Sequence, residues 1–220
     1  MTDLRPELPP LPAHMRHLRV DRGYPVPWFV AWVDKKGRAL TRGRGTPDFR
    51  ITHPNAVPEA HNGRKCWICG GKLGRWMAFT VGPMCAVNKT SSEPPSHTDC
   101  ADWAARACPF LARPHARRRE AGKPEGSGTP GVLIPRNPGV ALVWITQGYW
   151  PRKIEHGVLF TMGAAHETRW YCEGRPATRA EVEESIRGGL VELEKAASGS
   201  AIEMAALAND VRSAMAMVPA

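Results

Sequence analysis

The sequence "CWICGG" (residues 66–71) and the later stretch "SHTDCADW" (residues 96–103) decide how this chain can fold. Each stretch holds two soft metal ligands, and together they supply Cys66, Cys69, His97 and Cys100. A Cys-x-x-Cys turn brings two thiolates to one zinc ion, each about 2.3 Å from the metal. The glycine that follows, Gly70, permits the positive φ with which such a turn aims backbone N–H groups at sulfur. We therefore expect these four residues to bind one structural Zn²⁺.

The second ligand pair falls at the predicted start of a helix. Ser96 and Asp99 form a capping-box pattern after two prolines, which predicts that the helix begins at Ser96. His97 and Cys100 then lie three positions apart on one face of the first turn. The positive end of the helix dipole there favours a thiolate. Cys85 is an alternative to His97 as the fourth ligand.

Residues 74–84, "GRWMAFTVGPM", separate the two ligand pairs and contain a Gly-Pro bend, which predicts a short hairpin. The order of knuckle, hairpin and ligand-bearing helix over residues 64–108 resembles the treble-clef zinc finger. The order of "CWICG", "GPMC", "SSEPPSHTDC" and "EGRPATRAEV" also resembles uncharacterised zinc-binding proteins of bacteriophages and prophages. That resemblance implies a bacterial or viral cytoplasmic setting and no particular activity.

Three other functions would place different residues around the cysteines. A thioredoxin-like redox pair needs a helix at its first cysteine, and the glycines of "GGKLG" (residues 70–74) oppose one. An HNH-type nuclease carries a catalytic histidine between its ligand pairs, whereas residues 71–95 contain no histidine or aspartate. A catalytic zinc needs an open coordination position, whereas four ligands close the site. Enzymatic activity therefore stays open but is not expected, although His53 and His61 lie upstream.

Composition favours a globular protein that contacts polyanions. The chain of 220 residues can form one large or two small domains, and its net charge of +9 is concentrated in residues 1–65 and 111–139. Such an asymmetry is typical of a nucleic-acid-binding half joined to another module. The sequence has neither an apolar signal region nor an apolar run of about 18 residues. We therefore expect a cytoplasmic protein with reduced thiols and no membrane contact.

Changes in composition predict four segments. We expect a flexible basic arm over residues 1–23, a zinc-binding module with flanking strands over 24–112, a basic Pro/Gly-rich linker over 113–139 and a small α+β domain over 140–220. In the zinc module, residues 28–34 and 48–52 are typical of two paired strands. The glycine-rich loop between these strands, and the linker, supply the expected nucleic-acid contacts, which are Lys35, Lys36, Arg38, Arg42, Arg44, Arg117, Arg118 and Arg119.

The last segment begins with β-like runs and ends with two helices. Residues 140–147, 157–162 and 168–172 predict a small antiparallel sheet, with Trp150 among the tryptophans expected in its core. Each helix is predicted by a capping box, formed by Thr178 with Glu181 and by Ser200 with Glu203. We expect the adjacent glycines at 188 and 189 to end or kink the first helix.

The sequence therefore predicts an α+β protein. A small zinc-bound, treble-clef-like module with flanking strands is joined by the basic linker to a small antiparallel sheet with two helices. Zinc would stabilise the module, because the segment has few apolar residues and the energy of metal binding would keep it folded. The expected function is non-enzymatic: the arm, loop and linker bind nucleic acid, and the acidic C-terminal helices bind a protein partner. The alternative is a metal-dependent nuclease or other nucleic-acid-processing enzyme in phage–host conflict.

Overall fold

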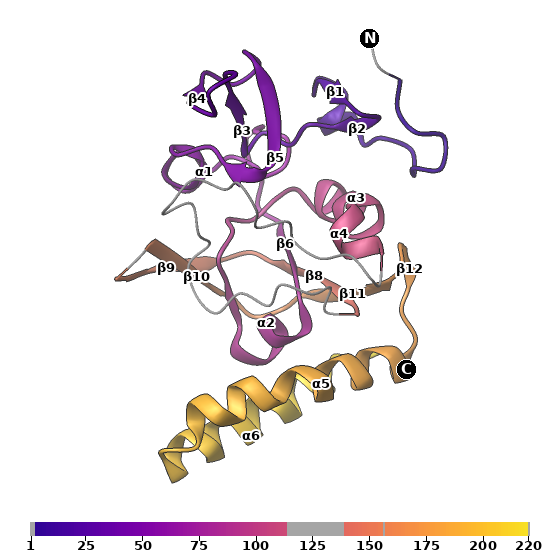
Figure 1. Ribbon diagram of the computed structural model, residues 1–220. Helices are drawn as coiled ribbons and strands as arrows, with labels where there is room; N and C mark the ends of the chain where they lie inside the picture. Colours follow the sequence, from indigo (N-terminus) through magenta and orange to yellow (C-terminus); the bar gives the residue numbers. More distant parts are fainter. Residues whose placement is uncertain (1–2, 114–138, 156, 220) are drawn as a thin grey trace.

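The computed structural model describes residues 3–113, 139–155 and 157–219 as a mixture of helices and small antiparallel sheets (Figure 1). In Figure 1 an N-terminal layer lies at the top, β-strands cross the middle, and two long helices lie at the bottom. The predicted mixture of helices and antiparallel strands is confirmed. The predicted linker falls almost entirely outside the described residues, and so do Arg117, Arg118 and Arg119.

The N-terminal layer is built around β3 (Val30–Val33), which lies between β4 (Ala39–Leu40) and β5 (Thr46–Thr52) in an antiparallel sheet. The predicted pairing of residues 28–34 with 48–52 is confirmed, since Val30 lies opposite Thr52 and Ala31 opposite Asp48. The apolar residues of β3 form a small core together with Val26. The other elements of this layer are η1 (Ala13–Met15), β1 (Val20–Asp21), β2 (Tyr24–Pro25) and α1 (Ala56–Gly63).

The central sheet joins segments from both sides of residues 113–139. Its order is β12-β11-β8-β6, and β8 (Ala141–Thr146) is buried along its whole length between β6 (Met77–Val81) and β11 (Glu167–Cys172). The hairpin predicted over residues 74–84 is therefore wrong: β6 pairs with β8, and α2 (Pro83–Asn88) follows it. A strand that is apolar on both faces needs a partner along each edge and cover on each face. The remaining strand, β12, spans Arg175–Pro176.

A second antiparallel sheet has the order β7-β10-β9. The turn after β8 carries the chain out of the central sheet, so that β9 (Tyr149–Ile154) pairs with β10 (Gly157–Met162) instead of β8. The short strand β7 (Thr90–Ser91) completes this sheet. The largest core contains side chains of both sheets, including Phe79, Trp144, Phe160, Met162 and Trp170.

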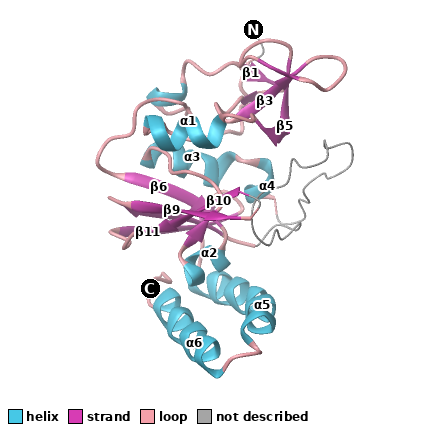
Figure 2. Cartoon of the chain, turned by 90° about the vertical axis from the view of Figure 1, so that its left-hand side faces the viewer, coloured by secondary structure: helices cyan, strands magenta, loops and turns pink. Residues whose placement is uncertain are grey.

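The two C-terminal helices, α5 (Arg179–Ala197) and α6 (Ala201–Met215), lie side by side against α2 (Figure 2). Thr178 and Glu181 form the predicted capping box, and the Ser200 side chain accepts a hydrogen bond from the Glu203 amide. The expected interruption at the glycine pair is wrong, because α5 continues through it. A Cβ at Gly189 would collide with the side chain of Met84 on α2, so glycine there permits the close approach of the two helices.

The segment 1–23, expected as a flexible arm, packs against the rest of the chain over its described residues. Met15 is fully buried, and Leu8, Leu11 and Leu18 are partly buried around the same core. The Nε1 of Trp103 donates a hydrogen bond to the carbonyl oxygen of Pro9. The spacing of these apolar residues gives the segment a face to bury, which outweighs its prolines. Among the residues described, none of the helices combines the length and apolarity needed to span a bilayer.

Candidate metal centre

Residues 65–72 form a tight turn that presents two cysteine sulfurs to the same point. The Cys66 amide donates to the Gly71 carbonyl, and the Gly70 amide donates to the Cys66 carbonyl. Lys65 and Lys72 form an isolated antiparallel β-bridge. Gly70 has the expected positive φ of 75°, and a Cβ there would collide with the ring of Trp28. The amides of Cys69 and Gly71 point at the sulfurs of Cys66 and Cys69, each at 3.4 Å. The turn therefore stabilises negative charge on both sulfurs.

The second ligand pair lies at the start of α3 (Thr98–Ala107). This helix starts one residue later than the sequence predicts. His97, not Ser96, is the N-cap residue, because Ser96 pairs with Ala78 of β6 through two backbone hydrogen bonds. Cys100 lies in the first turn, where the helix dipole favours a thiolate. The helix ends at Cys108, and α4 (Pro109–Ala112) follows.

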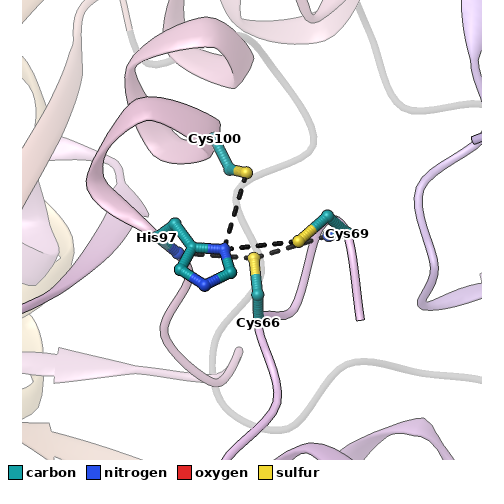
Figure 3. Close-up of side chains that lie close together, drawn as sticks. All are labelled: Cys66, Cys69, His97 and Cys100. Atoms are coloured by element: carbon teal, nitrogen blue, oxygen red, sulfur yellow. Dashed lines mark hydrogen bonds between the residues drawn. The ribbon is translucent and has the colours of Figure 1, made fainter. Parts of the chain in front are cut away.

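The four side chains converge on one point, as Figure 3 shows. The ligand atoms of Cys66, Cys69, His97 and Cys100 all lie within 4.8 Å of one another. The Nδ1 of His97 lies 3.3 Å from the Cys69 sulfur and 3.9 Å from the Cys100 sulfur. Sulfur and nitrogen ligands of a tetrahedral zinc ion lie roughly 3.5–3.8 Å apart, given metal–ligand distances of about 2.3 and 2.1 Å. The arrangement is therefore suited to bind a metal ion and is compatible with zinc.

A hydrogen bond fixes which nitrogen of His97 faces the sulfurs. The Nε2 atom lies 2.9 Å from the carbonyl oxygen of Lys72. A carbonyl oxygen can only accept, so Nε2 carries a proton, and Nδ1 is the nitrogen that a metal would bind after displacing its proton. Metal-bound histidines characteristically donate their second N–H in this way.

The site is enclosed by residues from three parts of the chain. The three cysteines belong to a buried core that also contains Met15 and Trp103. The Nε2 of His17 lies 3.0 Å from the carbonyl oxygen of Cys69. The ring of His14 stacks on that of His97, with centroids 4.1 Å apart. The sequence signal for this cover was the spacing of Leu8, Leu11, Met15 and Leu18, which is typical of a segment with one apolar side.

Close contact among the four side chains shifts the pKa values of three of them. Burial raises the pKa of the Cys66 thiol, but hydrogen bonds with Cys100, Cys69 and His97 together lower it well below its usual range. Hydrogen bonds with the sulfurs of Cys66 and Cys69 raise the pKa of His97 to about 11. Hydrogen bonding to Cys66 raises the pKa of the Cys100 thiol. Without a metal, negative charge is thus held on Cys66 beside a protonated His97, and a metal ion that binds here must displace protons from His97 and Cys100.

Cys85, the alternative fourth ligand, is not part of the cluster. It lies on α2 and packs against the core between the two sheets, and burial raises the pKa of its thiol to about 11. A buried thiol with a raised pKa behaves as a small apolar residue. Among the described residues, Cys66, Cys69, His97 and Cys100 provide three sulfurs and one nitrogen, a set compatible with a four-coordinate zinc ion.

The structure places the predicted nucleic-acid contacts of the N-terminal loop in two groups. Lys35, Lys36 and Arg38 lie in the exposed turn after β3. Arg44 lies at the same end of the sheet. Its neighbour Gly45 packs against the carbonyl oxygen of Val33, the last residue of β3, so closely that a Cβ would collide with it.

Arg42 points elsewhere, onto the ring of Trp28, with 4.0 Å between the guanidinium carbon and the ring centroid. Its Nη1 forms a 2.9 Å ion pair with Glu59, and its Nε donates to the Trp28 carbonyl. Arg42 therefore holds α1 against the N-terminal sheet, and its predicted contact with nucleic acid competes with these internal ones.

The upstream histidines have separate partners. His53 Nδ1 accepts from the Asn55 amide at 3.3 Å, and burial lowers the pKa of its ring. His61 Nδ1 lies 3.1 Å from the hydroxyl of Tyr149. Within the described ranges, neither histidine belongs to a group of three or more metal-ligating side chains.

No protein-family model matches this chain, and searches of curated proteins and of solved structures find no match either.

Proposed function

We propose that the chain is a zinc-stabilised, non-enzymatic protein that binds nucleic acid through the basic end of its N-terminal sheet. The observation that carries the proposal is the exposure of Lys35, Lys36 and Arg44 together at that end. In the described part of the chain, these three side chains form no ion pair within 4 Å, whereas Arg38 pairs with Asp34. Cations that no internal carboxylate neutralises are available to phosphates.

Zinc has a structural role in this proposal. The buried set of three sulfurs and one nitrogen ties residues 66–71 to the start of α3 and, through the surrounding core, to the N-terminal segment. The knuckle and the ligand-bearing helix support a treble-clef-like module, in which β6 extends into the central sheet where a hairpin was expected. Metal binding to such a site contributes directly to the free energy of folding.

The C-terminal helices are the proposed contact with a protein partner. Val191 on α5 and Ile202 on α6 are 50% and 83% exposed, and Met204 is 39% exposed. Exposed large apolar side chains that form a patch are typical of protein-contact surfaces. A cytoplasmic setting in a bacterium or a phage-infected cell belongs to the same proposal.

The test measures binding of the full chain to a labelled duplex and a labelled single strand at increasing salt. Three phosphate contacts predict that duplex affinity falls by about 40-fold between 50 and 200 mM salt. Lys36→Glu should weaken binding and make the salt dependence less steep, whereas the matched control Lys195→Glu, an exposed cation on α5, should change neither. Salt-independent binding, or none, would contradict the proposal. Cleavage that His53→Ala or His61→Ala abolishes would favour the nuclease alternative.

A further inference from the structure

Three turns meet at one end of the central sheet and form a groove. Trp76 directly precedes β6, Gln147 follows β8, and residues 163–166 precede β11. Since Met77 lies opposite Thr146 and Glu167 opposite Ile145, all three turns belong to the same end. The amide of Gly163 donates to the Gly148 carbonyl at 3.0 Å. A groove of about 370 Å³ lies among these turns, and its lining includes Trp76, Gln147, Trp150 and His166.

Two tryptophans of this groove are exposed to solvent, against the expectation that Trp150 lies in a core. Trp150 is 62% exposed and Trp76 is 39% exposed. Tryptophan is highly buried on average, so two exposed rings on one groove need an explanation. The Trp76 ring lies 4.3 Å from the His166 ring, and the Arg75 guanidinium lies 5.9 Å from the Trp76 centroid. These contacts hold the Trp76 ring in place.

The charge beside the groove is positive. Arg152 follows Trp150 by two residues on β9, so the two side chains share one face of the strand. Arg75 and Arg152 are exposed, and in the described residues neither has an ion pair within 4 Å. Glu167, next to His166, pairs with Arg169 at 2.6 Å, and Arg169 also pairs with Asp102. The groove therefore combines aromatic rings with two exposed arginines.

The polar lining also suits a nucleobase. The Gln147 side chain is exposed and, in the described part of the chain, makes no hydrogen bond. A primary amide offers both a donor and an acceptor, which is the pairing that the edge of an unpaired base presents. Aromatic rings that flank a basic path are the means by which proteins hold single strands, since every base has a face that can stack.

We propose that this groove binds an unpaired base of a nucleic-acid strand, which stacks on Trp150 and Trp76 while its phosphates contact Arg75 and Arg152. The inference rests on the nucleic-acid binding proposed above and adds a preference for single strands. In a duplex the bases are stacked on each other, so their faces are not available to these rings. Loss of one stacked base lowers single-strand affinity by about 5- to 150-fold.

The experiment titrates the full chain against a labelled oligothymidine and a labelled duplex of equal length at low salt. Trp150→Ala and Trp76→Ala should each weaken binding to the single strand by about 5- to 150-fold and leave duplex binding within about two-fold of the parent. Trp150→Phe should retain most of the single-strand affinity, because a phenyl ring still stacks. Ile202→Ala removes an even more exposed apolar side chain from α6 and should change neither affinity.

Single-strand affinities of both tryptophan variants within two-fold of the parent would overturn the inference, even if Lys36→Glu still weakens binding. Equal losses on single strand and duplex would also overturn it, because stacking acts on unpaired bases alone. If the parent chain binds neither oligonucleotide, nucleic-acid binding itself is overturned, and the base site with it.

Discussion

The Nε2 atom of His97 lies 2.9 Å from the carbonyl oxygen of Lys72, so the ligand that begins α3 is tied to the residue just after the Cys-x-x-Cys turn. This contact directs Nδ1 of His97 towards the sulfurs of Cys69 and Cys100. The knuckle and the helix are thereby held together by a hydrogen bond as well as by their shared ligand cluster. A metal ion placed among them would complete this link.

Substitution of His97 tests the fourth ligand. When a metal ligand loses only its hydrogen-bond partner, metal affinity typically falls by about 10- to 100-fold. His97→Ala removes the ligand itself, so metal affinity should fall by more than this. His97→Cys should retain one equivalent of metal, since a four-sulfur set also suits zinc. Competition with a chromophoric chelator measures both affinities. Parent-like affinity in His97→Ala would show that this histidine is not a ligand.

Thiol reactivity separates the ligand cysteines from Cys85. Metal removal by a chelator should increase the reactivity of Cys66, Cys69 and Cys100 towards an alkylating reagent, because all three lose the same ion. Cys85 should stay slow at neutral pH in both states, since burial raises the pKa of its thiol to about 11 and the thiolate is the reactive form. Peptide mapping by mass spectrometry identifies each site. Protection of Cys85 that depends on metal would contradict the ligand set.

Met15 tests whether the N-terminal segment belongs to the metal module. Met15 is fully buried beside the three ligand cysteines, so Met15→Ala should lower the free energy of unfolding by about 2–5 kcal/mol. The same variant should release metal to a chelator faster. Met204→Ala, at a site that is 39% exposed on α6, should change stability by at most about 0.5 kcal/mol. Equal, small effects in denaturant titrations would mean that residues 1–23 form a loose arm.

Gly70 and Gly43 form a matched pair for the geometry of the knuckle. Both have positive φ, 75° and 84°, so alanine at either position strains the backbone by roughly 1–3 kcal/mol. A Cβ at Gly70 would also collide with Trp28, whereas a Cβ at Gly43 meets nothing within 4 Å. Gly70→Ala should therefore lower thermal stability and metal affinity more than Gly43→Ala. Equal melting temperatures for the two variants would show that contact with Trp28 is unimportant.

Local features of the sequence predicted their structures well. The predicted capping side chains, Thr178 and Ser200, start both C-terminal helices, because a capping side chain bonds to an amide only a few residues away. The positive φ of Gly70 follows in the same way from the demands of a tight cysteine turn. The ligand set could be proposed because soft side chains at these spacings have few other uses in a reduced compartment.

Features that depend on distant partners were missed. The pairing of β6 with β8 joins residues on opposite sides of the predicted linker, and no local pattern specifies which strand a buried strand selects. A separate bridge pairs Ser96 with Ala78 of β6, which moves the start of α3 to His97. Gly189 looked like a helix breaker, but its lack of a side chain accommodates Met84. The exposure of Trp150 likewise depends on a turn that carries β9 into another sheet.

Elemental analysis of freshly purified full-length protein, combined with a thermal melt before and after chelation, addresses the metal centre most directly. We expect one equivalent of zinc per chain and a melting temperature that falls when the metal is removed. A chain that contains no stoichiometric metal, and that melts at the same temperature with and without chelator, would contradict the assignment of Cys66, Cys69, His97 and Cys100 as a structural zinc site.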